Sequence, residues 1–335
     1  MVGCGAPAPG THEHQLFAFG TLVELTFYGI SEQQAREAAQ LIDAMYQRQH
    51  QDWHAWQRGH LRELNEAIAE NQPIRTDPSV LELIQLGQHL ERISQGLFNP
   101  AIGNLLNIWG FQKDEAAQGP PPSAEAINSW LSLSPSTLDL ELDGLEVRSD
   151  NAAVRLDFGG FAKGYSVGKA VQLLEDKGIH NLIVNAGGDL CIRGKRGRRP
   201  WRIGIRDPRG SGVLASIELQ GAACVFTSGD YQRYFEFDGK RYHHIIDPGT
   251  GYPAQQTRSV SVIADDPMLA DAAATALFVA GPGRWKKIAM SMGVDEVLLL
   301  DDADTAYVTP GLARRLTYVQ RPATVTVAPL SNGAP

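Results

Sequence analysis

The sequence contains no hydrophobic run long enough to cross a membrane, and residues 1–20 lack the apolar core of a complete signal peptide. Its formal net charge of -8 argues against a general nucleic-acid binder. The phosphate-binding pattern Gly-x-x-x-x-Gly-Lys-[Ser/Thr] is absent, and no Gly-x-Gly-x-x-Gly follows a strand. These absences exclude two common nucleotide-binding architectures. The 43% of hydrophobic residues still allows a sizeable core in a chain of 335 residues.

Cysteine is scarce as well, with only Cys4, Cys191 and Cys224. The odd count argues against a disulfide framework, and the spacing does not resemble a metal cluster. Cys191 and Cys224 lie in apolar, strand-like runs, so we expect both to be buried, inert thiols. Cys4 follows Val-Gly and precedes a tail of small residues, like the end of a bacterial lipoprotein signal whose apolar part lies upstream.

The order of patterns predicts one compact α/β or α+β unit between a flexible leader at residues 1–15 and a disordered tail at residues 322–335. Residues 16–321 show no internal repeat and no clean linker. We expect a strand over residues 16–30 that ends at Gly29, and strand pairs around Asp143-Gly144 and Asp238-Gly239. Further expected strands cover 201–206, 213–219, 296–301 and 305–308, and expected helices cover 31–49, 78–95, 268–280 and 283–292.

Residues 156–190 are the most informative stretch, because two glycine-rich turns that carry acids flank one short helix. Glycine lets the backbone approach a ligand closely, and amides at a helix start attract phosphate. Asp157 and Lys163 in the first turn can serve opposite charges on one ligand. The stretch therefore predicts a site for a phosphate-bearing ligand, with or without a metal.

Asp271 and Thr275 lie four residues apart in an alanine-rich helix, which puts both oxygens on one face. Such a carboxylate and hydroxyl, joined by a backbone carbonyl, suit Mg²⁺. The alternative is a capping Asp with the Thr bonded back into its own helix.

His244 lies at a strand end beside Asp247, where a histidine can act as a general acid or base near neutral pH. His243, on the opposite face, is the candidate for a purely structural histidine. Thr227-Ser228-Gly229-Asp230-Tyr231 is expected to be a strand-terminal turn, since no Gly-x-Ser-x-Gly elbow is present. Four aromatic residues near loops can stack on a planar ring or pack in the core: Trp53, Trp56, Phe98 and Trp109.

Taken together, seven segments between residues 19 and 277 resemble, in their order, the ApbE-type FAD:protein FMN transferases. No single motif decides, but seven in one order are highly specific. The segments are Phe-Gly-Thr, Phe-Asn-Pro-Ala-Ile-Gly with Trp-Gly-Phe after it, Leu-Asp-Phe-Gly-Gly-Phe-Ala-Lys-Gly-Tyr, Asn-Ala-Gly-Gly-Asp, Thr-Ser-Gly-Asp-Tyr, His-Ile-Ile-Asp-Pro-Gly-Thr-Gly and Asp-Ala-Ala-Ala-Thr-Ala-Leu.

The resemblance implies a role for each residue that matches a functional position of the family. It implies metal ligation by Asp271 and Thr275 with the carbonyl of Gly160, and makes His244 the histidine needed for transfer. It implies FAD or flavin contacts at Phe19, Leu97, Phe98, Asn99, Asp157, Lys163 and Ile246. The chain departs from the family at Asn99, where Asp is usual, and between Trp53 and Asn65, where the usual Asp-Ser-Glu is missing.

The resemblance also implies a T-fold-like α/β (α+β) unit with mixed sheets and flanking helices. The implied activity is Mg²⁺-dependent transfer of FMN from FAD to a threonine of a partner protein, with release of AMP. The expected partner is a flavin-accepting subunit of a respiratory redox complex, and the expected place is the periplasmic side of the bacterial inner membrane, with a lipid at Cys4. A metal-dependent FAD pyrophosphatase and a non-catalytic flavin-binding protein are the alternatives; Mn²⁺ in place of Mg²⁺ also stays open.

Overall fold

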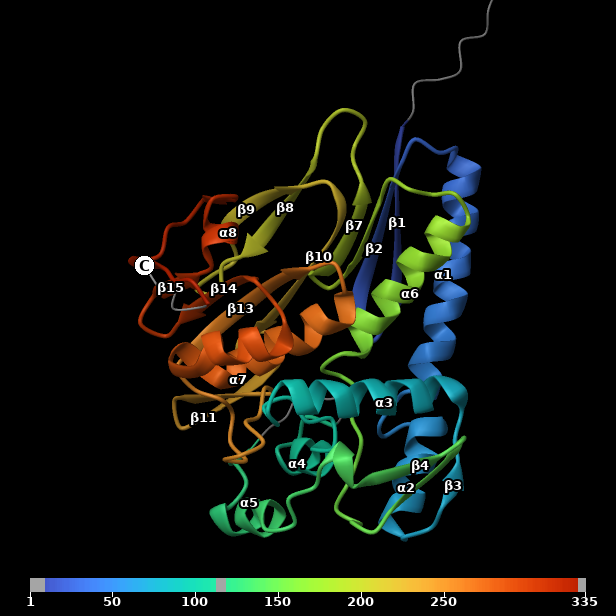
Figure 1. Ribbon diagram of the computed structural model, residues 1–335, viewed down its shortest axis with the longest axis vertical. Coiled ribbons are helices and arrows are strands. Elements are labelled where there is room, and N and C mark those ends of the chain that lie inside the picture. The colour runs from blue at the N-terminus through green and yellow to red at the C-terminus, as the bar shows by residue number, and fades with distance from the viewer. Residues whose placement is uncertain (1–9, 113–118, 331–335) are drawn as a thin grey trace, which may run out of the picture.

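A nine-stranded sheet forms the centre of the molecule, with helices over one face and a smaller sheet over the other (Figure 1). The computed structural model describes residues 10–112 and 119–330. In spatial order the strands of the large sheet are β1 (Thr11–Ala18), β2 (Thr21–Tyr28), β6 (Leu182–Ala186), β7 (Asp189–Gly194), β10 (Gly221–Gly229), β13 (Thr257–Ala264), β14 (Glu296–Asp301), β15 (Thr305–Val308) and β17 (Thr324–Val327).

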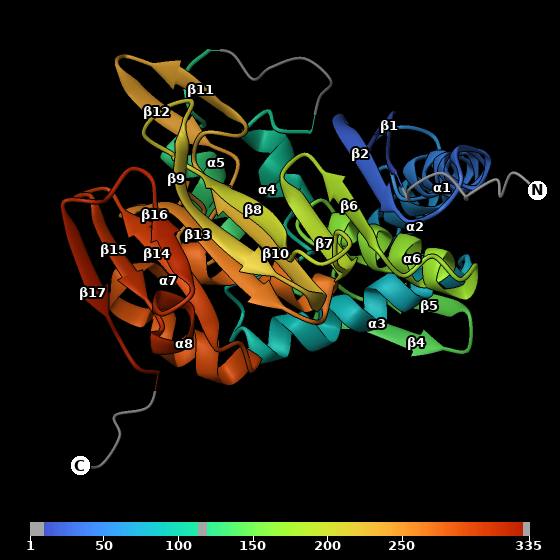
Figure 2. The same ribbon diagram turned by 90° about the horizontal axis from the view of Figure 1, so that it is seen from above.

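Three smaller sheets accompany the large one. Figure 2 shows the first two strands at one end of the molecule and the last strands at the other. In spatial order the smaller sheets are β16 (Leu316–Tyr318), β9 (Val213–Leu219) and β8 (Trp201–Arg206); β3 (Ile74–Arg75), β5 (Glu146–Ser149) and β4 (Leu140–Asp143); and the hairpin of β11 (Tyr234–Phe237) and β12 (Lys240–His243).

The helices are explained by their ends as much as by their apolar faces. Ser31 forms a capping box with Gln34 at the start of one long helix, and Asp266 caps another, where Pro267 occupies the first turn. No helix among the described residues is both long and apolar enough to span a bilayer. The helices are α1 (Glu32–Asp52), α2 (His60–Ala69), α3 (Pro78–Ile93), α4 (Gly103–Ile108), α5 (Ala124–Leu131), α6 (Ala162–Asp176), α7 (Pro267–Met292) and α8 (Pro310–Ala313), with a 3₁₀ turn at Thr137–Asp139.

Two apolar layers hold these elements together. The main core lies between the large sheet and the helices α1, α3, α6 and α7, where Phe27, Phe226 and Phe278 are fully buried. The second core fills the space between the other face of the large sheet and the sheet of β8, β9 and β16. The predicted mixed α/β fold with several sheets and flanking helices is thereby confirmed.

Most local predictions are confirmed, including the turns at Asp143-Gly144 and Asp238-Gly239 and the strands β8, β9, β14 and β15. The two helices expected at 268–280 and 283–292 are the halves of α7, which is interrupted at Gly281 with φ 63°. The helices α2, α4, α5 and α8 were not predicted.

Both chain ends are more ordered than expected. Residues 11–15 belong to β1 rather than to a flexible leader, and β1 pairs with β2 along its whole length. The expected single strand over 16–30 is therefore wrong, because Phe19 and Gly20 (φ 53° and 71°) turn the chain back. Residues 324–327 form β17 beside β15, within the expected disordered tail. The start of β1, Thr-His-Glu-His-Gln, is polar and so resembles a loop, whereas the alternation in β17, Thr-Val-Thr-Val, is itself typical of a strand. Residues 1–9, with Cys4, and residues 331–335 lie outside the described residues.

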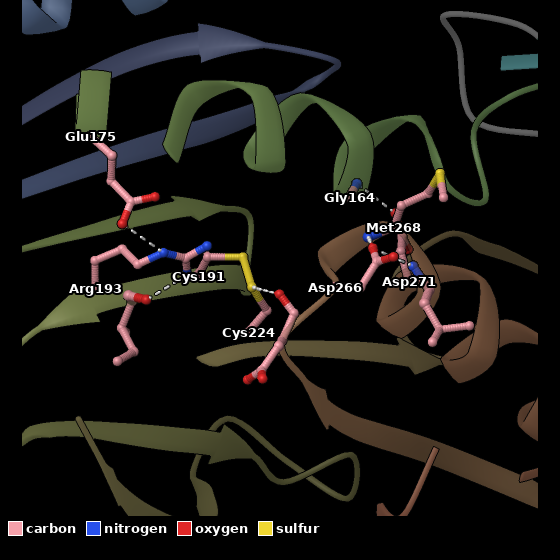
Figure 3. The surroundings of a disulfide bond; sticks show 11 residues. Gly164, Glu175, Cys191, Arg193, Cys224, Asp266, Met268 and Asp271 are labelled. Atoms are coloured by element: carbon pink, nitrogen blue, oxygen red, sulfur yellow. Dashed lines mark hydrogen bonds and ion pairs between the residues drawn. A yellow bond between two sulfur atoms is a disulfide. The ribbon is translucent and has the colours of Figure 1, made fainter. Parts of the chain in front are cut away.

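The prediction of two free buried thiols is wrong, because Cys191 and Cys224 form a disulfide (Figure 3). Cys191 in β7 and Cys224 in β10 lie directly opposite one another, with their Cα atoms 4.0 Å apart. The intervening strands β8 and β9 leave the large sheet for the smaller one, which makes β10 the neighbour of β7. The sequence gives no local signal for that pairing.

Candidate functional site

The candidate site lies at the end of the large sheet where two turns and the start of α6 meet. The β1–β2 turn at Phe19 packs beside the β6–β7 turn, since Gly187 donates its N–H to the carbonyl of Leu22 at 3.0 Å. Gly187 has φ 68°, and a Cβ there would lie 2.4 Å from Oγ1 of Thr21. Glycine is therefore needed at this position for two reasons: the backbone is left-handed, and a side chain would collide with Thr21. The close approach brings the Phe19 turn to the acid-bearing turn that ends in Asp189.

The loop before α6 is held in shape by buried hydrogen bonds. Asn65 of α2 accepts the N–H of Leu156 at 2.7 Å and donates to the carbonyl of the same residue at 2.9 Å. Next along the chain, Asp157 accepts the N–H of Gly159 at 2.8 Å and an N–H of Gln112 at 2.7 Å. Both oxygens of Asp157 thus have partners, and the carboxylate lies in a defined position near the start of α6.

Gly160 and the start of α6 pack against the segment Leu97–Asn99. A Cβ on Gly160 would lie 2.9 Å from the ring of Phe98, so the backbone approaches this aromatic side chain closely. Asn99 donates to the carbonyl of Pro135 at 2.9 Å and accepts the N–H of Ala101 at 2.8 Å. These two contacts fix the shape of the segment around Asn99. They do not require the negative charge that an Asp at this position would carry.

The N-terminus of α6 has no side-chain cap from its own N-cap residue, Phe161. Asp271 of α7 serves this end instead, accepting the N–H of Gly164 at 2.8 Å (Figure 3). A Cβ at Gly164 would lie 2.9 Å from Cβ of Asp271 and 2.4 Å from the carbonyl oxygen of Pro267, so the two helices meet here through glycine. The remaining amides at this helix start suit an anionic ligand.

One ammonium and two carboxylates form the charged centre of the site. Lys163 forms an ion pair with Asp189, which also accepts the N–H of Thr227 at 2.9 Å. Burial lowers the pKa of Lys163, but the carboxylates of Asp189 and Asp271 outweigh burial and raise this pKa above its usual value. Burial also raises the pKa of Asp271 to about 7, against the opposing charge of Lys163. The centre carries more negative than positive charge when all three groups are ionised.

Thr275 lies one helical turn after Asp271 and shares a hydrogen bond of 3.0 Å with the hydroxyl of Ser228. The strand-terminal turn expected over residues 227–231 is confirmed in part: residues 227–229 end the strand β10, and the turn follows at Asp230 and Tyr231. Among the described residues, no hydrogen bond joins the Thr275 hydroxyl to its own helix. The hydroxyl contacts Ser228 of β10, whereas the carboxylate of Asp271 contacts the start of α6. The capping alternative holds in part, since Asp271 caps α6 rather than its own helix.

These donors fit a hard divalent cation. No group of three or more His, Cys, Asp or Glu in the described part of the chain is placed to hold a metal. Magnesium is commonly held by one or two carboxylates together with water and substrate phosphates, so it does not require such a group. Burial disfavours the charged form of Asp271 and raises its pKa, so a bound cation would stabilise the ionised carboxylate. The candidate donors are Asp271, Thr275 and the carbonyl of Gly160.

His244 follows directly after β12 and is oriented by the backbone of Arg233. Nδ1 lies 3.2 Å from the carbonyl oxygen of Arg233, so this nitrogen carries the proton and Nε2 is left as a base. Burial lowers the pKa of His244 to about 3, with further contributions from the charges of Arg233, His243 and Lys163. The imidazole is therefore neutral near pH 7 and can accept a proton.

His244 is linked to the rest of the site through the segment Phe111–Gln112. The ring of Phe111 lies 6.4 Å from that of His244, and Arg233 donates to the carbonyl of Phe111. Gln112, the next residue, holds Asp157. His243 has the structural role expected of it, since its Nε2 lies 2.8 Å from the carbonyl oxygen of Ala254.

The remaining predicted contacts occupy two places. Phe19 packs edge-on against Tyr46 of α1 at a ring distance of 5.3 Å, at the same end of the sheet as Asp189. Ile246 is buried in a separate aromatic cluster with Trp109 and Phe111. Trp53 and Trp109 belong to the core, where their indole N–H groups donate to Ser79 and to Gly251. The flavin contacts stay predictions.

Sequence reasoning omitted three residues from the site: Gln112, Asp189 and Ser228. Asp189 was visible as the acid that follows two glycines, but its pairing with Lys163 joins positions 26 residues apart. Ser228 lies in the segment Thr-Ser-Gly-Asp-Tyr, but nothing local indicates that its partner is Thr275. Gln112 carries no local signal, because its partner Asp157 comes from a distant segment.

Comparison with known proteins identifies the family and the fold. The model of the ApbE family matches residues 19–298. An FAD:protein FMN transferase of Rhodobacter capsulatus is 42% identical over 331 residues, which cover 97% of this chain and 62% of that protein. The chain thus spans about three fifths of that relative. The crystal structure of an ApbE protein from Thermotoga maritima is similar with a TM-score of 0.83 and 33% identity, covering 91% of this chain and 99% of the other. The flavin transferase ApbE of Vibrio cholerae is similar with a TM-score of 0.80 and 27% identity, covering 92% and 99%.

Proposed function

Because the chain belongs to the ApbE family, we propose that it transfers FMN from FAD to a threonine hydroxyl of a partner protein and releases AMP, in the presence of Mg²⁺. The observation that carries the proposal is the charged centre of Lys163, Asp189 and Asp271 at the start of α6. The charge of Lys163 is among those that lower the pKa of His244 and keep its imidazole neutral. Such a site is suited to a pyrophosphate and to a weak nucleophile that must lose a proton.

The proposed chemistry exchanges the phosphoanhydride bond of FAD for a phosphoester bond to threonine. The threonine oxygen attacks the phosphorus of the FMN half, and the bond from that phosphorus to the oxygen of AMP breaks. Nε2 of His244 accepts the threonine proton, which raises the nucleophilicity of a weak hydroxyl. Lys163 and the amides of α6 stabilise the charge that develops on the phosphate oxygens. A bound Mg²⁺ would neutralise pyrophosphate charge beside Asp271 and Thr275.

Mass spectrometry of an acceptor protein tests the proposal directly. A flavin-accepting respiratory subunit is incubated with the protein, FAD and Mg²⁺, with and without EDTA. We expect a gain of one FMN on a threonine that EDTA abolishes. Release of FMN and AMP without an adduct would instead indicate a pyrophosphatase, in which water replaces the threonine. Neither product would indicate flavin binding alone.

The role of His244 is tested with His244→Ala against His243→Ala as the matched neighbour. We expect His244→Ala to bind FAD and to lose transfer by 10²–10⁴-fold, the usual contribution of a general base. His243→Ala is expected to lower stability while the folded fraction still transfers FMN. Normal transfer by His244→Ala would remove the base from the mechanism.

We also propose that the protein works on the periplasmic side of the inner membrane, with a lipid at Cys4. The Cys191–Cys224 bridge supports an oxidising compartment, because structural disulfides are rare in the cytosol. Partition into Triton X-114 tests the anchor. The protein made with its natural export signal should enter the detergent phase, and Cys4→Ser should stay in the aqueous phase. Equal partition of both would refute the anchor.

A further inference from the structure

A tight turn in the connection between β7 and β8 concentrates positive charge on a chain whose net charge is -8. Lys195, Arg196, Arg198 and Arg199 are all exposed, and none of them forms an ion pair with any described residue. No acid occurs between Arg193 and Arg202. We call these four residues the basic tip. Unpaired charge of one sign at one place is typical of a surface that meets an anionic partner.

The basic tip has a defined backbone. Arg196 and Arg199 exchange backbone hydrogen bonds of 2.9 and 3.1 Å across a two-residue turn, in which Gly197 has φ 66°. The N–H of Lys195 donates to the side chain of Asn181 at 3.0 Å. Arg196 and Arg199 thus lie directly opposite one another as like charges, an arrangement that destabilises a strand pair. A bound anionic surface would offset that repulsion.

The basic tip lies beside the place where the chain enters the fold. A Cβ on Gly197 would lie 2.8 Å from the hydroxyl of Tyr28, and Tyr28 pairs with Thr11, the first residue of β1. Gly10 accepts the N–H of Gly29 in the same region. Figure 1 shows the loop between β7 and β8 rising at the end of the molecule where β1 begins. Cys4 precedes Gly10 by six residues. A segment of this length spans at most about 20 Å, so a lipid at Cys4 would keep this end of the fold within about that distance of the membrane.

We propose that the basic tip docks on an anionic lipid surface and orients the protein on the membrane. The choice of a lipid surface rests on the proposed anchor at Cys4, since an anchored chain carries the basic tip to within reach of the headgroups. A cluster of Lys and Arg beside a membrane attachment is a known basis of binding to anionic lipid. An acidic protein is the alternative occupant.

Docking in this way holds the candidate site away from the bilayer. The strand β7 runs from Asp189, at the site, to Gly194, next to the basic tip. Five steps of about 3.3 Å separate the two ends of this strand by about 17 Å. The site therefore faces the aqueous side, where a second protein has access to it.

Vesicle sedimentation of the full chain made without its lipid tests the proposal. Vesicles of phosphatidylcholine with 30% phosphatidylglycerol, a fraction of about one third chosen for a strong surface potential, are compared with vesicles of phosphatidylcholine alone. We expect binding only to the anionic vesicles and loss of binding at high salt. The triple variant Arg196→Gln, Arg198→Gln, Arg199→Gln should bind about 100-fold more weakly, since each basic residue near the surface contributes about five-fold.

Two controls separate docking from net charge and from misfolding. Arg284→Gln, Lys286→Gln, Lys287→Gln changes the net charge equally on α7 and should bind like the wild type. Arg196→Lys, Arg198→Lys, Arg199→Lys keeps the charge of the basic tip and should also bind. The proposal is refuted if the wild type ignores anionic vesicles, if the first triple variant binds as tightly, or if the α7 variant loses as much. An acidic acceptor protein that binds in place of vesicles would identify the alternative occupant and also refute the proposal.

The vesicle result is independent of catalysis. The basic-tip variant should flavinylate a soluble acceptor at the wild-type rate, because none of its residues touches the candidate site. Failure of FMN transfer by the wild type would therefore leave the vesicle measurement intact, and failure of vesicle binding would leave the transferase proposal intact.

Discussion

Removal of the Cys191–Cys224 bridge is expected to lower the free energy of unfolding by about 4 kcal/mol. The bridge joins residues 33 positions apart. In the chain-entropy description, a closed loop of this size removes about 12 cal/mol/K from the unfolded chain, or about 3.7 kcal/mol at 25 °C. The perturbation is the double variant Cys191→Ala, Cys224→Ala, which avoids leaving a buried polar group between β7 and β10.

Urea denaturation followed by tryptophan fluorescence measures the loss under non-reducing conditions. Wild-type protein reduced before unfolding should show a similar loss, and Cys4→Ala should show none. Thiol titration of the denatured, unreduced chain made without its lipid should find one reactive thiol among three cysteines. Three reactive thiols would show that Cys191 and Cys224 are free. A double variant whose free energy of unfolding lies within about 1 kcal/mol of the wild type would also refute the reasoning.

Three further perturbations test the site and its supports. Burial lowers the pKa of His243 to about 4, below its unfolded value, so the unfolded chain takes up a proton first as pH falls. The free energy of unfolding should therefore drop by up to about 3 kcal/mol between pH 6.5 and 4. Calorimetry should find that the stability of His243→Gln depends less steeply on pH. Parallel curves of stability against pH for the variant and the wild type would contradict this. Asn65→Ala strands two buried backbone groups of Leu156 and should cost about 2–6 kcal/mol in urea denaturation, against less than about 0.5 for the exposed control Asn107→Ala. Gly164→Ala should cost about 1–3 kcal/mol and weaken FAD binding in fluorescence titration by displacing Asp271; unchanged FAD affinity would separate this contact from the ligand site.

Local chemistry explains why many elements could be predicted. The turns at Asp143-Gly144 and Asp238-Gly239 need backbone angles that these residue types favour, so the strands around them follow from sequence alone. The halves of α7 are separated by Gly281-Pro282, a pair that interrupts a helix without reference to the rest of the fold. The start of β1, Thr-His-Glu-His-Gln, is polar and resembles a leader, and β17 is only 4 residues long, so neither strand was predicted in full.

Amino-acid sequence by itself determined the turns, most helices and strands, the family resemblance, and the residue types of the site, because glycine, proline and helix caps act on their own neighbours. Tertiary structure alone decided that β7 lies beside β10, that Cys191 meets Cys224, and that Lys163 faces both Asp189 and Asp271. Those contacts join segments far apart in the chain, and they exist only after burial of the shared core has selected one arrangement of the strands.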